Sequence, residues 1–205
     1  MSRGSRTRAR ILDVAQEAVL AKGFEATSID EIVYDAGITR SGFFYHFRDK
    51  RALAVEMIAR YTKTAIEEID EIIDRARELT DDPLQVLLIT LKLIAEGIAE
   101  SPNGHPGCVV ATAAFHDRLV GVEIREANRR AVEDWRDQFR KLLDAVVAVY
   151  PPNDEIDLDS LADFMSGAVA GGIVMSRAHG RPIITAEYLL LVRSHVKLLF
   201  KPRYQ

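Results

Sequence analysis

The sequence contains a single cysteine, Cys108, among 205 residues. One cysteine excludes an intrachain disulfide and a four-cysteine zinc site. No apolar run approaches the ~18 residues of a membrane-spanning helix, and no apolar core of a secretory signal follows the basic N-terminal segment MSRGSRTRAR. The sequence shows no internal repeat, no low-complexity segment and no convincing strand. These absences predict a cytoplasmic, all-helical protein with no membrane partner.

Acidic residues are missing from the first ten positions, which contain Arg3, Arg6, Arg8 and Arg10. Residues 1–52 hold nine Lys and Arg against seven Asp and Glu, although the whole chain has a formal net charge of −4. A basic N-terminal end on an acidic protein is compatible with DNA binding, because attraction to the phosphates depends on the local electric field and not on the net charge of the chain. These arginines would add sequence-independent affinity or reach into the minor groove. The alternative is a solvated tail without a role.

Apolar residues recur at helical spacing along most of the chain, and capping residues, prolines and glycines mark the helix ends. About nine helices are expected. The first ends at Lys22, the second has the capping box Ser28-x-x-Glu31 and ends at Gly37, and the third runs from Thr39 to about Phe47. The fourth follows Asp49 for about seven turns, the fifth runs from Pro83 to about Glu100, and a short sixth covers 108–117. The seventh covers 121–150, the eighth runs from Asp157 or Asp159 to near Gly180, and the ninth is capped by Thr185.

The predicted helices divide the chain in two. Residues 1–48 form a three-helix head, and residues 49–205 form a larger helical domain. The second and third helices, joined by a glycine turn, are the parts of a helix-turn-helix. In such a unit the second helix enters the major groove and presents its N-terminal residues, here Thr39, Arg40 and Ser41, to base edges. On pattern alone, an αα-corner without a ligand is the alternative.

Four aromatic rings and a histidine follow within residues 43–47. Phe43 and Phe47 are four residues apart on the helix, so we expect both in the small core of the head. Phe44, Tyr45 and His46 then point elsewhere. Tyr45 and His46 can donate hydrogen bonds to phosphates.

Residues 27–53, TSIDEIVYDAGITRSGFFYHFRDKRAL, resemble the DNA-binding signature of the TetR (tetracycline repressor-like) family. That signature runs roughly T-x-x-x-I-x-x-x-A-G-V-S-x-G-x-x-Y-x-H-F-x-x-K-x-x-L. The matching residues are Thr27 or Ser28, Ile32, Ala36, Gly37, Ile38, Thr39, Phe47, Lys50 and Leu53. The residues predicted to contact DNA are Thr27, Ser28, Thr39, Arg40, Ser41, Gly42, Phe44, Tyr45, His46 and Lys50. The resemblance implies that Lys50 meets a phosphate at the start of the fourth helix.

The sequence departs from the family pattern at two places. Family members usually carry glycine where Ser41 stands and Ser or Thr where Gly42 stands, so this pair looks exchanged. The family's common tyrosine falls on Phe44, which has no hydroxyl. Tyr45, one place on, is the candidate for the phosphate contact which that hydroxyl makes in the family.

Three glycines fall within six positions of the predicted eighth helix. Each costs roughly 1 kcal/mol relative to alanine, which close helix–helix approach would explain. With the apolar stripe of the last helix, this segment resembles the family's dimerising pair of helices. The predicted dimer interface comprises Gly167, Ala168, Gly171, Gly172, Val192, Val196 and Leu199. Intrachain packing and a flexible kink are the alternatives.

The resemblance also implies a small-molecule effector bound among the fourth to eighth helices. The candidates are polar or aromatic residues in apolar segments: Tyr61, Cys108, Phe115, His116, Trp135 and Met165. For each of them taken alone, a place in the ordinary core or surface is the favoured alternative. The spacing of His105, Cys108 and His116 is not specific for a metal, and a Cys108–His116–Asp117 set lacks an oxyanion-hole signature. We therefore predict no metal, no cofactor and no enzymatic activity.

Taken as a whole, the sequence predicts a homodimeric regulator that binds a near-palindromic operator in double-stranded DNA. We expect it to act as a repressor that is released when a small molecule binds the larger domain. The alternative is a helical ligand-binding protein or enzyme with a non-functional DNA-binding head. The effector, the operator, the target genes and the choice between silencing and activation leave no signal in the sequence.

Overall fold

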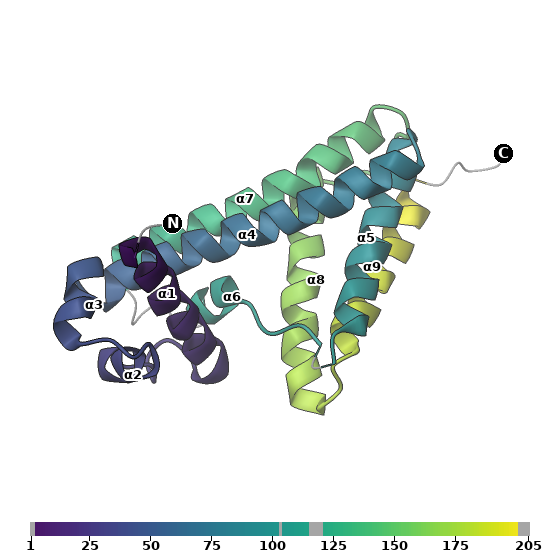
Figure 1. The fold of residues 1–205 in the computed structure, drawn as a ribbon. Helices are drawn as coiled ribbons and strands as arrows, with labels where there is room; N and C mark the ends of the chain where they lie inside the picture. The colour runs from purple at the N-terminus through teal and green to yellow at the C-terminus, as the bar shows by residue number, and fades with distance from the viewer. Residues whose placement is uncertain (1–2, 103, 115–120, 201–205) are drawn as a thin grey trace. The chain divides into compact units, whose positions relative to one another are not determined.

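The computed structural model describes residues 3–102, 104–114 and 121–200, with the side chain of Arg3 left out, and over these residues the chain is helical without strands (Figure 1). The helices are α1 (Arg3–Lys22), α2 (Ile29–Asp35), α3 (Arg40–His46), α4 (Lys50–Leu79), α5 (Pro83–Glu100), α6 (Val109–Ala114), α7 (Val122–Val147), α8 (Leu158–His179) and α9 (Ile184–Leu199). The prediction of an all-α fold is confirmed.

Local signals in the sequence set most of the helix ends. The Asp82 carboxylate accepts a hydrogen bond from the Gln85 amide at 2.9 Å, and Pro83 occupies the first position of α5. Asp157 caps α8 in the same way, accepting from the Ser160 amide at 3.0 Å. A side-chain oxygen at this position satisfies one of the amides that a helix N-terminus leaves without a partner.

Two helices begin differently from the prediction. α1 already starts at Arg3, so the arginines of the N-terminal segment belong to a helix and not to a tail. Thr185 is not the N-cap of α9, because the helix begins at Ile184 and Thr185 is fully buried. Its amide donates to the Ser176 hydroxyl at 3.2 Å, so a residue of α8 satisfies the amide instead.

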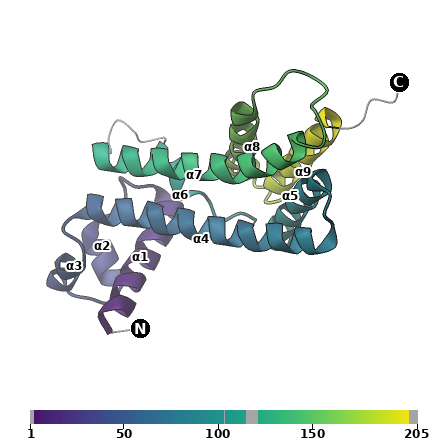
Figure 2. The ribbon, with the colours of Figure 1, turned by 90° about the horizontal axis from the view of Figure 1, so that it is seen from above.

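The described residues fall into two compact units, one drawn from residues 1–63 and 107–132 and the other from 64–106 and 133–205. α4 and α7 each begin in the first unit and end in the second. They lie side by side in both Figure 1 and Figure 2. The functional division at residue 48 stays a prediction.

The first unit packs α1, α2 and α3 with the beginning of α4, α6 and the beginning of α7 around one apolar core. Its fully buried large side chains are Ile11, Ile32, Phe43, Met57, Ile58 and Ile124. α1 contacts both α2 and α6, and α2 contacts α3. This core fixes the position of α3, the predicted recognition helix.

The second unit is built on α9, which packs against both α5 and α8. Its fully buried large side chains are Leu87, Leu91, Leu143, Met165, Leu189 and Phe200. α8 and α9 approach each other closely at Gly172. A Cβ atom added there would lie 2.7 Å from the Thr185 Cα, so only glycine fits this position without a shift of α9.

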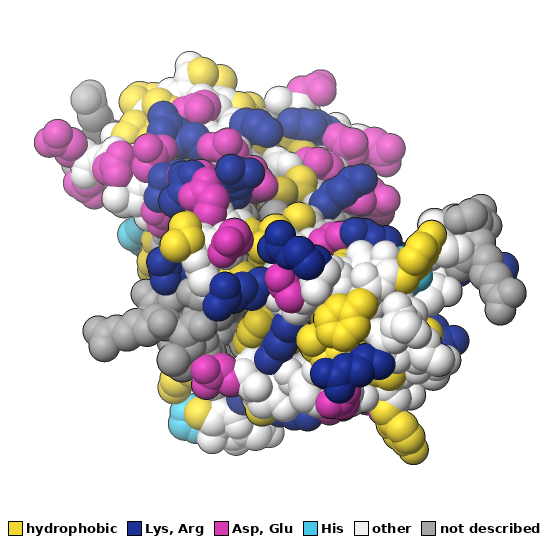
Figure 3. All heavy atoms as spheres, turned by 90° about the vertical axis from the view of Figure 1, so that its left-hand side faces the viewer, with side chains coloured by type: hydrophobic (Ala, Val, Ile, Leu, Met, Phe, Trp, Pro, Cys, Tyr) yellow, Lys and Arg dark blue, Asp and Glu magenta, His cyan; other side chains and the backbone are white. Residues whose placement is uncertain are grey.

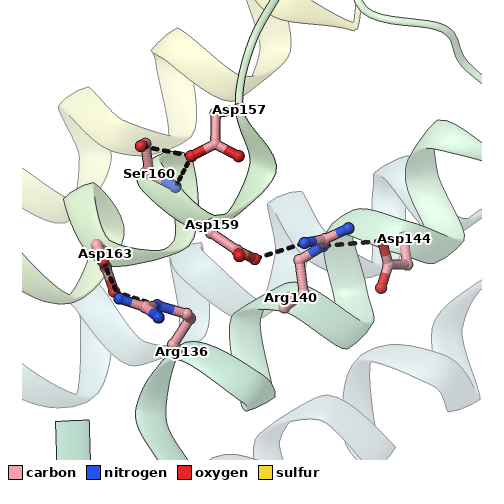
Figure 4. A network of polar contacts seen from close by, with 7 residues as sticks. All are labelled: Arg136, Arg140, Asp144, Asp157, Asp159, Ser160 and Asp163. Atoms are coloured by element: carbon pink, nitrogen blue, oxygen red, sulfur yellow. Dashed lines mark hydrogen bonds and ion pairs between the residues drawn. The ribbon is translucent and has the colours of Figure 1, made fainter. Parts of the chain in front are cut away.

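A chain of ion pairs joins α7 to α8 within the second unit (Figure 4). Arg136 donates to both carboxylate oxygens of Asp163, at 2.8 and 2.5 Å. One turn on, Arg140 bridges Asp144 of its own helix and Asp159 of α8, at 2.9 and 2.5 Å. The Arg136 guanidinium holds the pKa of the Asp163 carboxyl below its ordinary value.

Among the described residues, one helix, α8, is long and apolar enough to cross a membrane by length and composition alone. Helices in the cores of soluble proteins meet the same criteria of length and composition, so α8 alone does not indicate a membrane span. One side of α8 contributes Leu161, Ala162 and Met165 to the core of the second unit.

Candidate nucleic-acid interface

The helix-turn-helix begins with a capping box on α2. The Ser28 hydroxyl accepts a hydrogen bond from the Glu31 amide at 3.1 Å, and the Glu31 carboxylate accepts one from the Ser28 amide at 3.4 Å. The same carboxylate pairs with Lys22 at the end of α1, 2.5 Å away, and this contact lowers the pKa of Glu31. The start of α2 is therefore fixed to the end of α1.

The turn between α2 and α3 passes through Gly37, whose φ of +57° lies in the left-handed region that favours glycine. The Ile38 amide closes the turn by donating to the Val33 carbonyl at 3.1 Å. A Cβ atom at residue 37 would also lie 2.7 Å from Nη2 of Arg10, so this guanidinium covers the turn.

α3 begins at a side-chain cap. The Thr39 hydroxyl accepts from the Gly42 amide at 3.1 Å and lies 3.1 Å from the Ser41 hydroxyl. A Cβ atom on residue 42 would come within 3.2 Å of the Thr39 hydroxyl oxygen. A side chain at position 42 would therefore crowd the hydroxyl that caps α3, which is a physical reason for glycine at this position.

Thr39, Arg40 and Ser41, at the N-terminus of α3, are all exposed, as a recognition helix requires. The Arg40 guanidinium makes an ion pair with Asp30 of α2, with 2.8 Å between Nη1 and Oδ1. Figure 3 turns the side of Figure 1 that carries α1–α3 toward the reader, and there Lys and Arg side chains are interspersed with acidic and hydrophobic ones.

The aromatic residues of α3 divide as the helical spacing predicts. Phe43 and Phe47 are buried, with ring centroids 5.9 Å apart. Phe44 is 45% exposed, although its ring meets the edge of Phe43, and Tyr45 is 84% exposed. The Tyr45 hydroxyl is thus accessible to a phosphate, and the His46 ring lies against the Tyr45 ring at 5.0 Å.

Two of the predicted DNA contacts, Thr27 and Lys50, make hydrogen bonds within the head itself. Thr27 is 1% exposed and donates its hydroxyl proton to the Gly23 carbonyl at 2.9 Å, so DNA cannot reach it; Ser28, which is exposed, remains the candidate. The Lys50 ammonium donates a hydrogen bond to the Phe24 carbonyl. A phosphate bound by Lys50 would use the remaining N–H donors of the same ammonium.

The N-terminal arginines have different roles. Arg8 forms an ion pair with Glu56 of α4, and its guanidinium lies 4.7 Å from the centre of the Phe47 ring. Arg6 is exposed, one helical turn before Arg10. Tyr34 of α2, which lies off the buried stripe of that helix, is 84% exposed.

The predicted effector contacts are divided between the two units. Tyr61 and Cys108 belong to the first unit, where the Tyr61 hydroxyl donates to the Gly107 carbonyl at 3.1 Å. Trp135 and Met165 belong to the second unit, where Met165 is fully buried in the core. Phe115 and His116 lie outside the described residues.

The predicted dimer residues also divide. Val192, Val196 and Leu199 are buried in the core of their own chain, and Gly172 lies against Thr185 of α9, so these four positions pack within the single chain. Gly167 and Gly171 have open space where a Cβ would stand, and Ala168 is partly buried. The exposed apolar side chains of α8 and α9 are Phe164, Val174, Met175, Leu190, Leu191 and Leu198.

No group of three or more His, Cys, Asp or Glu side chains in the described ranges is arranged to hold a metal ion. His105, one of the residues considered for a metal, is partly buried in the second unit. Burial and the nearby Arg177 lower its pKa.

Comparisons with known proteins agree with this geometry. The family model described as bacterial regulatory proteins, tetR family, matches residues 11–57, which run from α1 into α4. An uncharacterized HTH-type transcriptional regulator of Bacillus subtilis, YxaF, is 27% identical over 180 residues, covering 85% of this chain and 86% of its own. The regulator AcrR of Shigella flexneri is 37% identical over 81 residues, 40% of this chain and 36% of its own.

The fold extends the similarity beyond the head. A TetR-family transcriptional regulator from Agrobacterium tumefaciens superposes with a TM-score of 0.78 at 20% identity, covering 96% of this chain and 99% of its own. At that identity the comparison shows the fold alone. Residues 11–57 therefore match the tetR family of bacterial regulatory proteins, and the chain shares the fold of a solved TetR-family regulator.

Proposed function

We propose that this DNA-binding regulator is a cytoplasmic homodimeric repressor without enzymatic activity, and that a small molecule releases it from a near-palindromic operator. The observation that carries the proposal is the exposed N-terminus of α3, where two hydroxyls and a guanidinium stand on a capped, tightly packed helix. Arginine can bind guanine with two hydrogen bonds, and hydroxyls can bind bases or phosphates.

Pairing of two chains through α8 and α9 supports the proposed dimer. Phe164, Leu191 and Leu198 are each more than half exposed in the single chain, which is unusual for three large apolar side chains on neighbouring helices. Gly167 and Gly171 leave room for the backbone of a partner helix. A twofold dimer would present two recognition helices to two half-sites.

Two buried polar atoms of the first unit support an effector site there. Among the described residues, the Thr62 hydroxyl oxygen and the Asn128 side-chain carbonyl oxygen are buried without a hydrogen-bond partner. Leaving such groups unsatisfied costs stability, so an ordered water or a ligand is expected to complete them. Thr62 follows Tyr61, one of the predicted effector contacts.

An effector can release DNA only if it binds two conformations of the protein with different affinities. α4 contributes to both compact units, and its first residue, Lys50, contacts the turn after α1. We propose α4 as the element through which effector binding changes the separation of the two recognition helices.

DNA binding measured against salt concentration tests the proposal. We expect one duplex sequence, selected from a random library, to bind well above a scrambled duplex, with an affinity that falls steeply as salt rises. Arg40→Ala should lower the affinity for the selected sequence more than for the scrambled one. A protein that prefers no sequence, including the region upstream of its own gene, contradicts the regulator and favours a ligand-binding protein with an inactive head.

A further inference from the structure

The ion pair between Asp30 and Arg40 crosses from α2 to the first residue of α3. We propose that Asp30 is a specificity-determining residue: its carboxylate steers Arg40 toward a base edge and away from the phosphates. This inference rests on the proposed DNA-binding function. It assigns the selectivity of the head partly to an acidic side chain that lies on the helix before the recognition helix.

The neighbouring polar groups are already engaged, which leaves Asp30 as the residue that holds Arg40. Thr39 and Ser41, on either side of Arg40, interact with each other and with the start of α3. The other acidic residue in the first turn of α2, Glu31, binds Lys22 and completes the capping box. The Asp30 carboxylate instead points across to the guanidinium.

Both side chains of the pair are open to solvent, at 65% for Arg40 and 71% for Asp30. An exposed ion pair is weak, so DNA can compete with it. The contact with Asp30 uses Nη1 of the guanidinium. Arginine has five N–H donors, so others remain available for the N7 and O6 acceptors of guanine.

The two possible destinations of Arg40 on DNA differ in what happens to Asp30. If Arg40 binds a guanine edge, its guanidinium can keep a bond to Asp30. If Arg40 turns to a phosphate, the Asp30 carboxylate is left without its partner near a negatively charged backbone, which is unfavourable. The pair therefore raises the discrimination between the right base and any phosphate, at some cost in total affinity.

The test compares Asp30→Asn, Arg40→Gln and the double variant on the sequence that the natural protein selects and on a scrambled duplex, over a range of salt concentrations. We expect Asp30→Asn to raise affinity for the scrambled duplex about two- to fivefold, the range of one exposed ion pair. The salt dependence on that duplex should steepen by about 0.9 in the logarithmic slope, since Arg40 then neutralises one more phosphate.

The double-variant cycle separates this role from simple charge removal. In the Arg40→Gln background, Asp30→Asn should change neither the slope nor the preference. Asp35→Asn is the matched control, because Asp35 is an exposed carboxylate at the other end of α2, and it should leave the preference intact. Asp30→Glu, which keeps the carboxylate, should retain most of the preference.

Equal effects of Asp30→Asn with and without Arg40 overturn the inference and make Asp30 a general repulsive charge. A loss of affinity that is confined to the selected sequence and persists in Arg40→Gln also overturns it, because Asp30 then reads a base itself. These results leave the regulator proposal standing. A natural protein that selects no sequence removes the regulator proposal first, and this inference with it.

Discussion

The ammonium of Lys50 donates a hydrogen bond to the main-chain carbonyl of Phe24, with 2.5 Å between Nζ and the oxygen. It also lies 5.0 Å from the centre of the Phe24 ring. These contacts join the first residue of α4 to the segment between α1 and α2, 26 positions earlier in the chain. Burial lowers the pKa of Lys50, and the bond to the Phe24 carbonyl joins its ammonium to the head.

We expect Lys50→Met to destabilise the protein by about 1 kcal/mol, after allowance for the partial exposure of the side chain. It should also weaken binding to every DNA sequence alike, because it removes both a positive charge and the support of the α1–α2 segment. Thermal unfolding followed by circular dichroism, with DNA titrations, measures both effects. Lys50→Arg separates them, since it keeps the charge but not the compact ammonium. Unchanged stability in Lys50→Met would assign this residue to phosphate contact alone.

The glycines of α8 predict opposite outcomes for two neighbouring positions. Gly172→Ala should destabilise the second unit by about 1–3 kcal/mol, because the new methyl group meets the backbone of α9 at Thr185. Gly171→Ala meets open space in the single chain and should add up to about 1 kcal/mol through helix propensity. Chemical denaturation of the two variants checks both signs.

A larger side chain at position 171 tests the dimer. Gly171→Leu should leave the fold of the chain intact but convert a dimer to a monomer, because the side chain fills the space proposed for a partner helix. Light scattering gives the mass. A variant with the same mass as the natural protein places the partner surface elsewhere.

Acid should destabilise the second unit. The Asp82, Asp157 and Asp163 carboxyls all have pKa values below the ordinary value of 3.8, because each accepts a strong hydrogen bond: from Tyr150, Ser160 and Arg136 respectively. A carboxyl whose pKa is lower in the folded state stabilises the fold above pH ~4 and loses that contribution as pH falls through the lowered value.

Trp135 is the single tryptophan and packs against the core of the second unit, so its fluorescence reports this unfolding. Asp163→Asn should lower stability at pH 7 and make it less sensitive to acid, since the group that titrates is gone. Asp137→Asn, at an exposed position of α7, serves as the control. An acid transition that is the same in Asp163→Asn and the natural protein rules out a contribution from this carboxyl.

Thr62→Val tests the unsatisfied hydroxyl of α4. Thr62 is only 3% exposed, and valine has almost the same shape without the hydroxyl. In the absence of a ligand the variant should be about 1 kcal/mol more stable, because a buried group without a partner is removed. Its melting temperature checks this, and a response to effector that weakens in the same variant supports the site. A less stable variant shows that the hydroxyl has a partner.

The sequence predicted what local chemistry decides. Ser28, Thr39 and Asp157 each cap the helix that follows them, because a short oxygen-bearing side chain can reach an amide two or three residues on. The burial of Phe43 and Phe47 followed from their spacing alone.

Contacts between distant segments could not be predicted in this way. That Lys50 turns to the Phe24 carbonyl and that Thr27 turns inward depend on how α1, α2 and α4 pack. The three glycines of α8 looked alike in the sequence, but only the structure shows that Gly172 faces α9 whereas Gly167 and Gly171 do not.

The fit of Gly172 against Thr185 links the evolution of two positions. A larger residue at 172 is compatible with this packing only if the α9 backbone moves outward, and a smaller residue at 185 gives little relief because the nearest atom is its Cα. Close homologues that keep the α8–α9 pair should therefore keep glycine at 172 more strictly than at 167 or 171. If homologues also keep glycine at 167 and 171, where the single chain leaves open space, the constraint comes from a neighbouring molecule.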